Sequence, residues 1–112
     1  MGEKISIAYQ VNASAGAEGK TSIYTVPAPR NFVLREVLIH FPSGTDGDLK
    51  LAFYIGDFKV LPREGYYTGD GGMLKDDSDA TFNAGEDITL YYKNENATEA
   101  KKAYILIKGE LV

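Results

Sequence analysis

The stretch FVLREVLIHF, residues 32–41, is the longest apolar run in the chain and decides its fold class. Apolar side chains occupy both parities of a two-residue repeat: Val33, Val37, Ile39 and Phe41 on one, and Phe32, Leu34 and Leu38 on the other. A strand that is apolar on both faces lies in the centre of a sheet, or carries a bulge that shifts its register, here near Arg35 and Glu36. Residues 32–41 therefore predict a central β-strand.

Segments on either side alternate apolar and polar residues with the period of a half-buried strand. The clearest is residues 4–11, where Ile5, Ile7, Tyr9 and Val11 share one face. Strands are also predicted at residues 20–26, 49–55, 58–61, 80–82, 87–93 and 103–111. Gly56-Asp57, between two apolar runs, predicts a type II′ hairpin. The two terminal strands are expected to pair and so to protect two sheet edges.

Two segments lack a clear strand pattern. Residues 63–79 are rich in Gly and Asp, and they predict a long surface loop with one short strand at most. Residues 94–102 are polar, and one helical turn is expected over residues 98–102.

Eight short strands in 112 residues, separated by frequent turn signals, are typical of a sandwich of two sheets. We therefore predict one all-β domain over residues 1–112, an antiparallel two-sheet β-sandwich with jelly-roll or Greek-key topology. A closed barrel is the structural alternative, because it is built from the same alternating strands.

The charge distribution argues against nucleic-acid and membrane partners. The net charge is −4, and the clearly biased stretch, residues 61–80, carries two basic and five acidic residues. Nucleic acids and anionic bilayers attract clustered Lys and Arg, which the sequence lacks. No apolar run approaches the ~20 residues that span a bilayer, and the N-terminus lacks the apolar core of a signal peptide. A virion or the cytoplasm is the expected location.

Reactive groups for catalysis are scarce. The chain has no Cys and a single His, His40, which lies in the predicted central strand. A cupin-type metal centre needs several His ligands, and no nucleophile motif accompanies any Ser that His40 would serve. The sequence therefore predicts no enzyme and no cofactor. A hydrolase on a sandwich scaffold would need convergent carboxylates, which no motif in the sequence indicates.

Loop carboxylates are the metal-binding candidates. Calcium takes oxygen ligands from loops, and the residues of this kind are Asp46, Asp48, Asp70, Asp76, Asp77 and Asp79. Their spacing matches no EF-hand, and Asp next to Gly is also ordinary turn chemistry. A calcium site is kept as a secondary hypothesis.

Aromatic residues supply the candidates for contact with a partner. Tyr66-Tyr67 and Tyr91-Tyr92 are adjacent pairs, so one member of each pair should be buried and the other is free to face outward. Exposed tyrosines suit sugar stacking or a protein interface. The interface candidates are Phe58, Tyr66, Tyr67 and Tyr91, together with the apolar residues of 32–41 that a sandwich cannot bury on both faces.

Two segments resemble the β-sandwich domains of phage and virus particles. Residues 24–37 read as a strand, a Val-Pro turn and a second strand, and residues 82–92 read Phe-x-x-Gly-Glu-x-Ile at the start of a strand. The resemblance implies a structural role in a virion, as a capsid-decoration, spike or tail component, and assembly as a homo-oligomer.

The leading prediction is thus a non-enzymatic structural or interaction domain that self-associates. The alternative is a carbohydrate- or ligand-binding module, with a glycan as partner and calcium as a stabilising ion.

Overall fold

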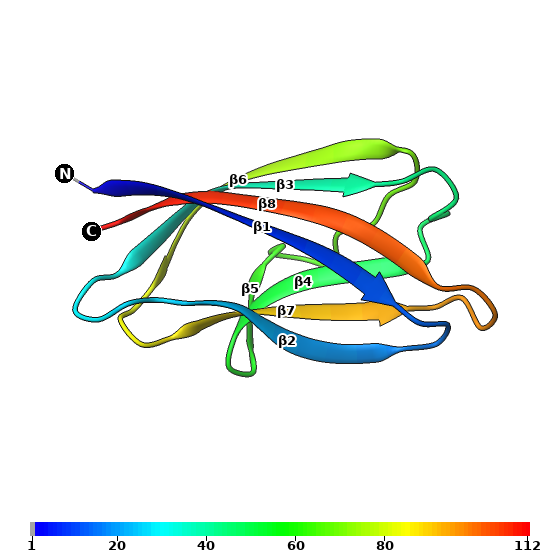
Figure 1. Ribbon diagram of the computed structural model, residues 1–112, viewed down its shortest axis with the longest axis horizontal. Helices are drawn as coiled ribbons and strands as arrows, with labels where there is room; N and C mark the ends of the chain where they lie inside the picture. The colour runs from blue at the N-terminus through cyan, green and yellow to red at the C-terminus, as the bar shows by residue number, and fades with distance from the viewer. Residues whose placement is uncertain (1) are drawn as a thin grey trace.

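A computed structural model describes residues 2–112, which form eight strands and no helix. The strands are β1 (Glu3–Ala13), β2 (Glu18–Thr25), β3 (Phe32–Phe41), β4 (Leu49–Ile55), β5 (Phe58–Leu61), β6 (Gly72–Phe82), β7 (Asp87–Asn94) and β8 (Lys101–Leu111). They run close to the long axis of a body that measures 46 × 24 × 22 Å (Figure 1). Among the described residues, no helical segment has the length and apolarity to cross a membrane.

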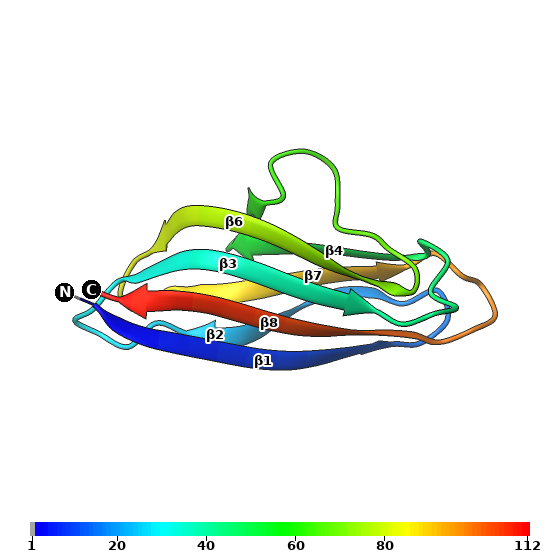
Figure 2. The same ribbon diagram turned by 90° about the horizontal axis from the view of Figure 1, so that it is seen from above.

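The strands build two four-stranded antiparallel sheets with the orders β1-β8-β3-β6 and β2-β7-β4-β5. Apart from the β4–β5 hairpin, each connection carries the chain from one sheet to the other, which is the arrangement of a jelly roll. Figure 2 shows the first sheet from above, with β1 and β6 as its outer strands. Each sheet keeps two edges, so the sandwich prediction is confirmed and the barrel alternative is wrong.

The central strand β3 shows both features that its sequence predicts. It lies between β8 and β6, and its register against both neighbours shifts between Leu34 and Glu36. The bulge turns Phe32 and Leu34 to the same side as Val37, Ile39 and Phe41, and all five side chains are buried. Most of the two-sided apolar character is therefore absorbed by the core, and Val33 and Leu38 remain half-exposed on the outer face.

The core fills the space between the two inner faces. Four phenylalanines, Phe32, Phe41, Phe53 and Phe82, are almost fully buried there with branched aliphatic residues from both sheets. Gly109 on β8 makes this packing possible, since a Cβ atom there would lie 2.3 Å from the carbonyl oxygen of Val33 and 2.4 Å from the Phe32 ring. The predicted Gly56-Asp57 hairpin is confirmed, with Ile55 paired to Phe58 and a φ of 56° at Gly56.

Two local predictions are wrong. The loop expected over residues 63–79 covers only residues 62–71, because Gly72–Phe82 is an eleven-residue edge strand, β6. Its inner face carries Leu74, Asp76, Ser78, Ala80 and Phe82, and the two polar residues among these five hide the strand pattern. The helical turn expected over residues 98–102 is absent, because β8 already begins at Lys101. The N–H groups of Thr98 and Glu99 donate instead to the Asn96 side chain in a bend before the strand.

The terminal strands pair as expected. β1 and β8 form an antiparallel ladder from Glu3 opposite Leu111 to Ala13 opposite Lys101. Both ends of the chain therefore lie at the same end of the sandwich (Figure 1).

Candidate functional site

Three tyrosines gather on the outer face of the β2-β7-β4-β5 sheet. Tyr54 comes from β4, Tyr91 from β7 and Tyr66 from the 62–71 loop. The Tyr66 and Tyr91 ring centroids are 5.5 Å apart and inclined by 36°, and those of Tyr54 and Tyr91 are 5.9 Å apart and inclined by 53°. These tilted contacts lie within the range that aromatic pairs favour.

The strand register explains why the rings meet. Tyr91 has the small Ala52 directly opposite it on β4, and Tyr54 has Thr89 opposite it on β7. The small partners leave room for the two tyrosines to contact each other diagonally across the strands. Tyr66 joins them only because its loop folds back over the sheet.

Lysine side chains lie over these rings. The Lys20 ammonium is 4.2 Å from the Tyr54 ring centroid, and those of Lys59 and Lys50 are 5.0 and 5.8 Å from the Tyr66 centroid. Contacts of this length are cation–π interactions. We call Tyr54, Tyr66, Tyr91, Lys20, Lys50 and Lys59 the tyrosine–lysine surface.

Three acidic residues at the margin of this surface balance its three lysines. Lys20 forms an ion pair with Asp57 at 3.5 Å, and Lys50 forms one with Glu95 at 3.2 Å. The Tyr91 hydroxyl donates a hydrogen bond to the Glu18 carboxylate. Three carboxylates thus accompany the three ammonium groups, so the surface is aromatic and has no net positive charge.

Two phenols of this surface, those of Tyr54 and Tyr91, have a raised pKa and stay protonated at neutral pH. Burial, followed by the hydrogen bond to Glu18, raises the pKa of Tyr91. Burial, followed by the proximity of Tyr66, raises the pKa of Tyr54. Both groups are therefore neutral hydroxyls that can donate and accept hydrogen bonds.

The four contact candidates predicted from the sequence differ in their exposure to solvent. Phe58 in the β4–β5 hairpin is 72% exposed and Tyr66 is 41% exposed, so both are available to a partner. Tyr91 is half-buried within the tyrosine–lysine surface. Tyr67 is only 5% exposed and is therefore wrong as a contact residue, which agrees with the expectation that one member of the Tyr66-Tyr67 pair is buried.

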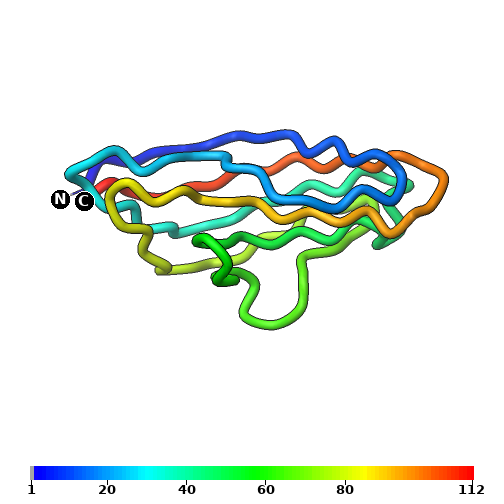
Figure 3. Tube along the Cα trace, turned by 90° about the horizontal axis from the view of Figure 1, so that it is seen from below, coloured from blue at the N-terminus to red at the C-terminus, as the bar shows by residue number. Residues whose placement is uncertain are grey.

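Tyr67 holds the loop that presents Tyr66. Its N–H donates to the carbonyl of Leu51 at 2.8 Å, and its carbonyl accepts from the N–H of Leu51 at 3.0 Å. Its ring packs edge-on against Phe53, and its hydroxyl donates to the Asp76 carboxylate on β6 at 2.6 Å. Burial, followed by this hydrogen bond, raises the pKa of Tyr67. The residue thus ties the loop to both sheets, while the loop itself projects from the body (Figure 3).

The aspartates proposed for calcium fall into two separate groups. Asp46, Asp48 and Asp70 lie in loops, where Asp70 accepts a hydrogen bond from the N–H of Gly44, and backbone hydrogen bonds lower the pKa of Asp70. Asp76, Asp77 and Asp79 lie on β6, with Asp76 facing inward and the other two facing outward. Within residues 2–112, no three acidic, His or Cys side chains are grouped as metal ligands. Calcium binding stays a prediction.

His40 lies on the outer face of β3, away from these groups. Its ring stacks on Tyr104 of β8 with centroids 6.0 Å apart and planes inclined by 23°. The same face carries Met73, which is 64% exposed, opposite His40 on β6. This is a packing arrangement of the sheet surface.

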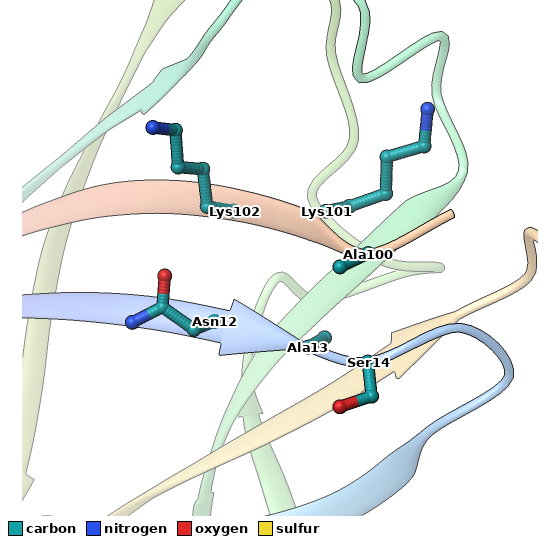
Figure 4. A pocket seen from close by; sticks show the side chains of 6 residues that line it. All are labelled: Asn12, Ala13, Ser14, Ala100, Lys101 and Lys102. Atoms are coloured by element: carbon teal, nitrogen blue, oxygen red, sulfur yellow. The ribbon is translucent and has the colours of Figure 1, made fainter.

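A shallow pocket lies at the end of the sandwich where β1 ends and β8 begins (Figure 4). Its volume of about 230 Å³ is below the roughly 300–1,000 Å³ of typical ligand sites. Its lining residues are Asn12, Ala13, Ser14, Ala100, Lys101 and Lys102. The Lys101 amine is turned away to donate to the Gly44 carbonyl at 2.6 Å, so the pocket offers little chemistry.

Comparison with known proteins identifies solved structures that have a similar fold. No family model matches the chain, and no curated protein matches its sequence. A chain of the cyanophage Pam1 capsid asymmetric unit superposes with a TM-score of 0.67 at 8% identity, over 99% of this chain and 86% of that one. A chain of the acid-stable capsid of Helicobacter pylori bacteriophage KHP30 superposes with a TM-score of 0.57 at 13% identity, over 100% and 97%.

A chain of the Bacillus endospore appendages, which are disulfide-linked pili, superposes with a TM-score of 0.51 at 16% identity, over 100% of this chain and 92% of that one. The chain therefore shares its fold with the β-sandwiches of phage capsids, as its sequence resemblance predicts.

The sequence candidates did not include four residues of the tyrosine–lysine surface, Tyr54, Lys20, Lys50 and Lys59. Their outward positions follow from strand alternation, but their convergence depends on strand order.

Proposed function

We propose that this protein is a non-enzymatic structural component of a virion that decorates the capsid and self-associates. The observation that supports it is the superposition over nearly the whole length of small chains from two phage capsids. The alignment also covers 86% and 97% of the two matched chains, so each of them is close to this chain in size and shares its fold.

The arrangement of side chains agrees with a structural role. Within the described residues, the single His stacks on Tyr104, and the phenols of Tyr54 and Tyr91 stay protonated. The exposed groups are aromatic and apolar residues on the sheet surfaces, such as Phe58, Tyr66 and Met73. Such groups bury area against a partner and do not make or break bonds.

The virion role is tested on particles. Virions from the source of the gene are purified on a density gradient, and the copy number of this chain is measured by quantitative mass spectrometry against the major shell protein. We expect a fixed ratio that matches the symmetry of the shell. Absence of the chain from infectious particles would overturn the virion role, as would a gene neighbourhood of glycosidases without virion genes.

Self-association is tested separately on the purified protein. Sedimentation velocity is measured from about 5 to 500 µM, which covers the affinities of weak and moderate homo-oligomers. We expect a concentration-dependent oligomer, and a monomer at every concentration would contradict self-association.

The tyrosine–lysine surface favours a second function, binding of an acidic glycan. Aromatic rings pack against the C–H faces of sugars, phenol hydroxyls bond to sugar hydroxyls, and lysines pair with carboxylates. On a glycan array, Tyr66→Ala would abolish binding, whereas Tyr104→Ala on the opposite sheet, with 40% of Tyr104 exposed, would not. If the wild-type protein binds no acidic glycan, this function is excluded.

A further inference from the structure

The four edge strands of the sandwich differ in how they resist pairing with another chain. Exposed edges recruit other strands, and proteins block them with charges, prolines, bulges or shortness. Three of the four edges carry such features. β5 has only four residues and is followed by Pro62. β2 has a register shift between Ser22 and Tyr24, and β6 carries Lys75 and three aspartates.

The fourth edge, β1, has only two charged residues, Glu3 and Lys4 at its start, and it is neither short nor interrupted by a proline or a bulge. It is eleven residues long and pairs with β8 in unbroken register. After Glu3 and Lys4, residues 5–13 contain no charge, proline or glycine. Within the described residues, no strand pairs with the other side of β1, which forms the outer margin of its sheet (Figure 2).

The inward side chains of this edge are incompletely covered. Ile5, Ile7 and Tyr9 face the core but are only partly buried. The neighbouring strand β8 differs, since its inward residues Ile105 and Ile107 are 3% and 0% exposed. The apolar side chains of β1 therefore remain partly exposed to solvent, and a strand added beside β1 would bury them further.

We propose that two copies of this chain pair through β1, antiparallel, about a two-fold axis at Ile7. The inference refines the self-association part of the proposed function by naming its surface. It extends the β1-β8-β3-β6 sheet of one copy into that of its partner and makes one eight-stranded sheet. A two-fold interface of this kind is isologous and closed, so it yields a dimer and not a filament.

The sequence of β1 is complementary to itself in this register. Ile7 meets the partner's Ile7, and Ile5 meets the partner's Tyr9, so the three partly buried side chains cover one another. On the outer face, Ser6 lies opposite the partner's Ala8, and Lys4 lies opposite the partner's Gln10. No pair of like charges is placed across the axis, which favours a second copy as the occupant over a charged partner.

A pair of matched variants tests the surface and the register together. In Ser6→Glu/Ala8→Glu, two glutamates face each other twice across the axis, whereas in Ser6→Glu/Ala8→Lys each glutamate faces a lysine. Both positions are exposed, and Ser6 lies opposite Lys108 within the chain, so the fold should tolerate the changes. Thr68→Glu/Ala84→Glu adds the same charge at exposed positions away from β1.

Sedimentation equilibrium with the wild type and the three variants measures the dimer dissociation constant, and circular dichroism confirms that each variant is folded. We expect a wild-type dimer, a dissociation constant raised about tenfold or more in the Glu/Glu variant, and wild-type-like or tighter association in the Glu/Lys variant. The Thr68/Ala84 control should match the wild type. A wild-type monomer, a non-dimeric oligomer or aggregate, or a dimer equally stable in the Glu/Glu variant would overturn the proposal.

Cross-linking gives a second measurement that does not depend on charge. The chain has no Cys, so a single introduced thiol reports on its own position. Directly opposite residues have Cα atoms within disulfide reach, whereas diagonal ones do not. We expect diamide to link Ile7→Cys into a dimer and to leave Ala8→Cys monomeric on a denaturing gel, and the reverse would contradict the two-fold axis at Ile7.

The two proposals fail differently. A β1 dimer in solution whose chain is absent from particles would refute the virion role and leave the interface standing. A chain found in particles that stays monomeric in solution would refute the interface and leave the virion role standing.

Discussion

Replacing Tyr67 by Phe removes one hydroxyl from the contact that ties the 62–71 loop to β6. The lost hydrogen bond, 2.6 Å long, is donated to the Asp76 carboxylate by a side chain that is only 5% exposed. Hydrogen bonds to charged groups contribute about 1.5–3 kcal/mol, and the half-buried Asp76 would lose a donor that water replaces only in part. We therefore expect the free energy of unfolding to fall by about 1.5–3 kcal/mol.

The assay is thermal and urea denaturation at neutral pH. A loss of this size corresponds to a decrease in Tm of roughly 6–12 °C for a domain of about 100 residues. Asp76→Asn is the matched comparison, because its amide oxygen still accepts the Tyr67 hydrogen bond, and a smaller loss is expected. A Tyr67→Phe protein as stable as the wild type, or an Asp76→Asn protein that is less stable than Tyr67→Phe, would refute the reasoning.

The same contact predicts a pH dependence. The pKa of Tyr67 is raised in the folded protein above its ordinary value of 10.0, because burial and the Asp76 hydrogen bond favour the neutral phenol. A raised folded-state pKa stabilises the fold fully below the unfolded-state pKa, and the stabilisation is lost as the pH rises above it, by up to about 1.4 kcal/mol per pH unit. Between pH 10 and 12 the wild type should therefore lose stability more steeply than Tyr67→Phe, and parallel curves would contradict the assignment.

Three further changes test other parts of the structure. Gly109→Ala places a Cβ atom 2.3 Å from the Val33 carbonyl oxygen, so we expect urea denaturation to show a free energy of unfolding lower by about 3 kcal/mol or more, or no soluble protein. Gly72 has open space around it, so the stability of Gly72→Ala should stay close to that of the wild type. Lys101→Met removes the 2.6 Å hydrogen bond to the Gly44 carbonyl and the 3.7 Å ion pair with Asp48 from a side chain that is 5% exposed. We expect the free energy of unfolding to fall by about 2 kcal/mol, and a rise would show that packing of the apolar part of the side chain contributes more than these polar contacts. Chelation with EDTA should leave Tm within about 1 °C of its value in calcium, because a bound ion would stabilise the folded state by mass action, and a larger decrease would support a calcium site.

Strand alternation in the sequence predicts most of this fold. Residues 32–41, 49–55 and 58–61 form strands with the predicted bounds, and the bulge near Arg35 follows from the change of apolar parity. These strands can be predicted from the sequence because at least one face of each is uniformly apolar. The edge strand β6 cannot be predicted in this way, because Asp76 and Ser78 occupy two of its core-facing positions. These polar side chains are tolerated there because the edge of the sheet is open to water. Its aspartates therefore look like loop residues.

The candidate surface is predictable only in part. The alternation of Tyr66 and Tyr67 shows that one of them is buried, but which one depends on the backbone pairing between Tyr67 and Leu51. Tyr54 and Tyr91 are both outward by alternation, and their contact requires the knowledge that β4 lies beside β7. Strand order across the two sheets is a long-range property, and local patterns do not encode it.

The ladder between β1 and β8 also bears on how the molecule can be re-engineered. Since Glu3 lies opposite Leu111 in this ladder, a few residues would suffice to join the start of the first strand to the end of the last one. A circular permutant opened within the projecting 62–71 loop should retain all eight strands. Fusion partners added at both ends would emerge together from one end of the sandwich, and the loops at the opposite end would stay uncovered.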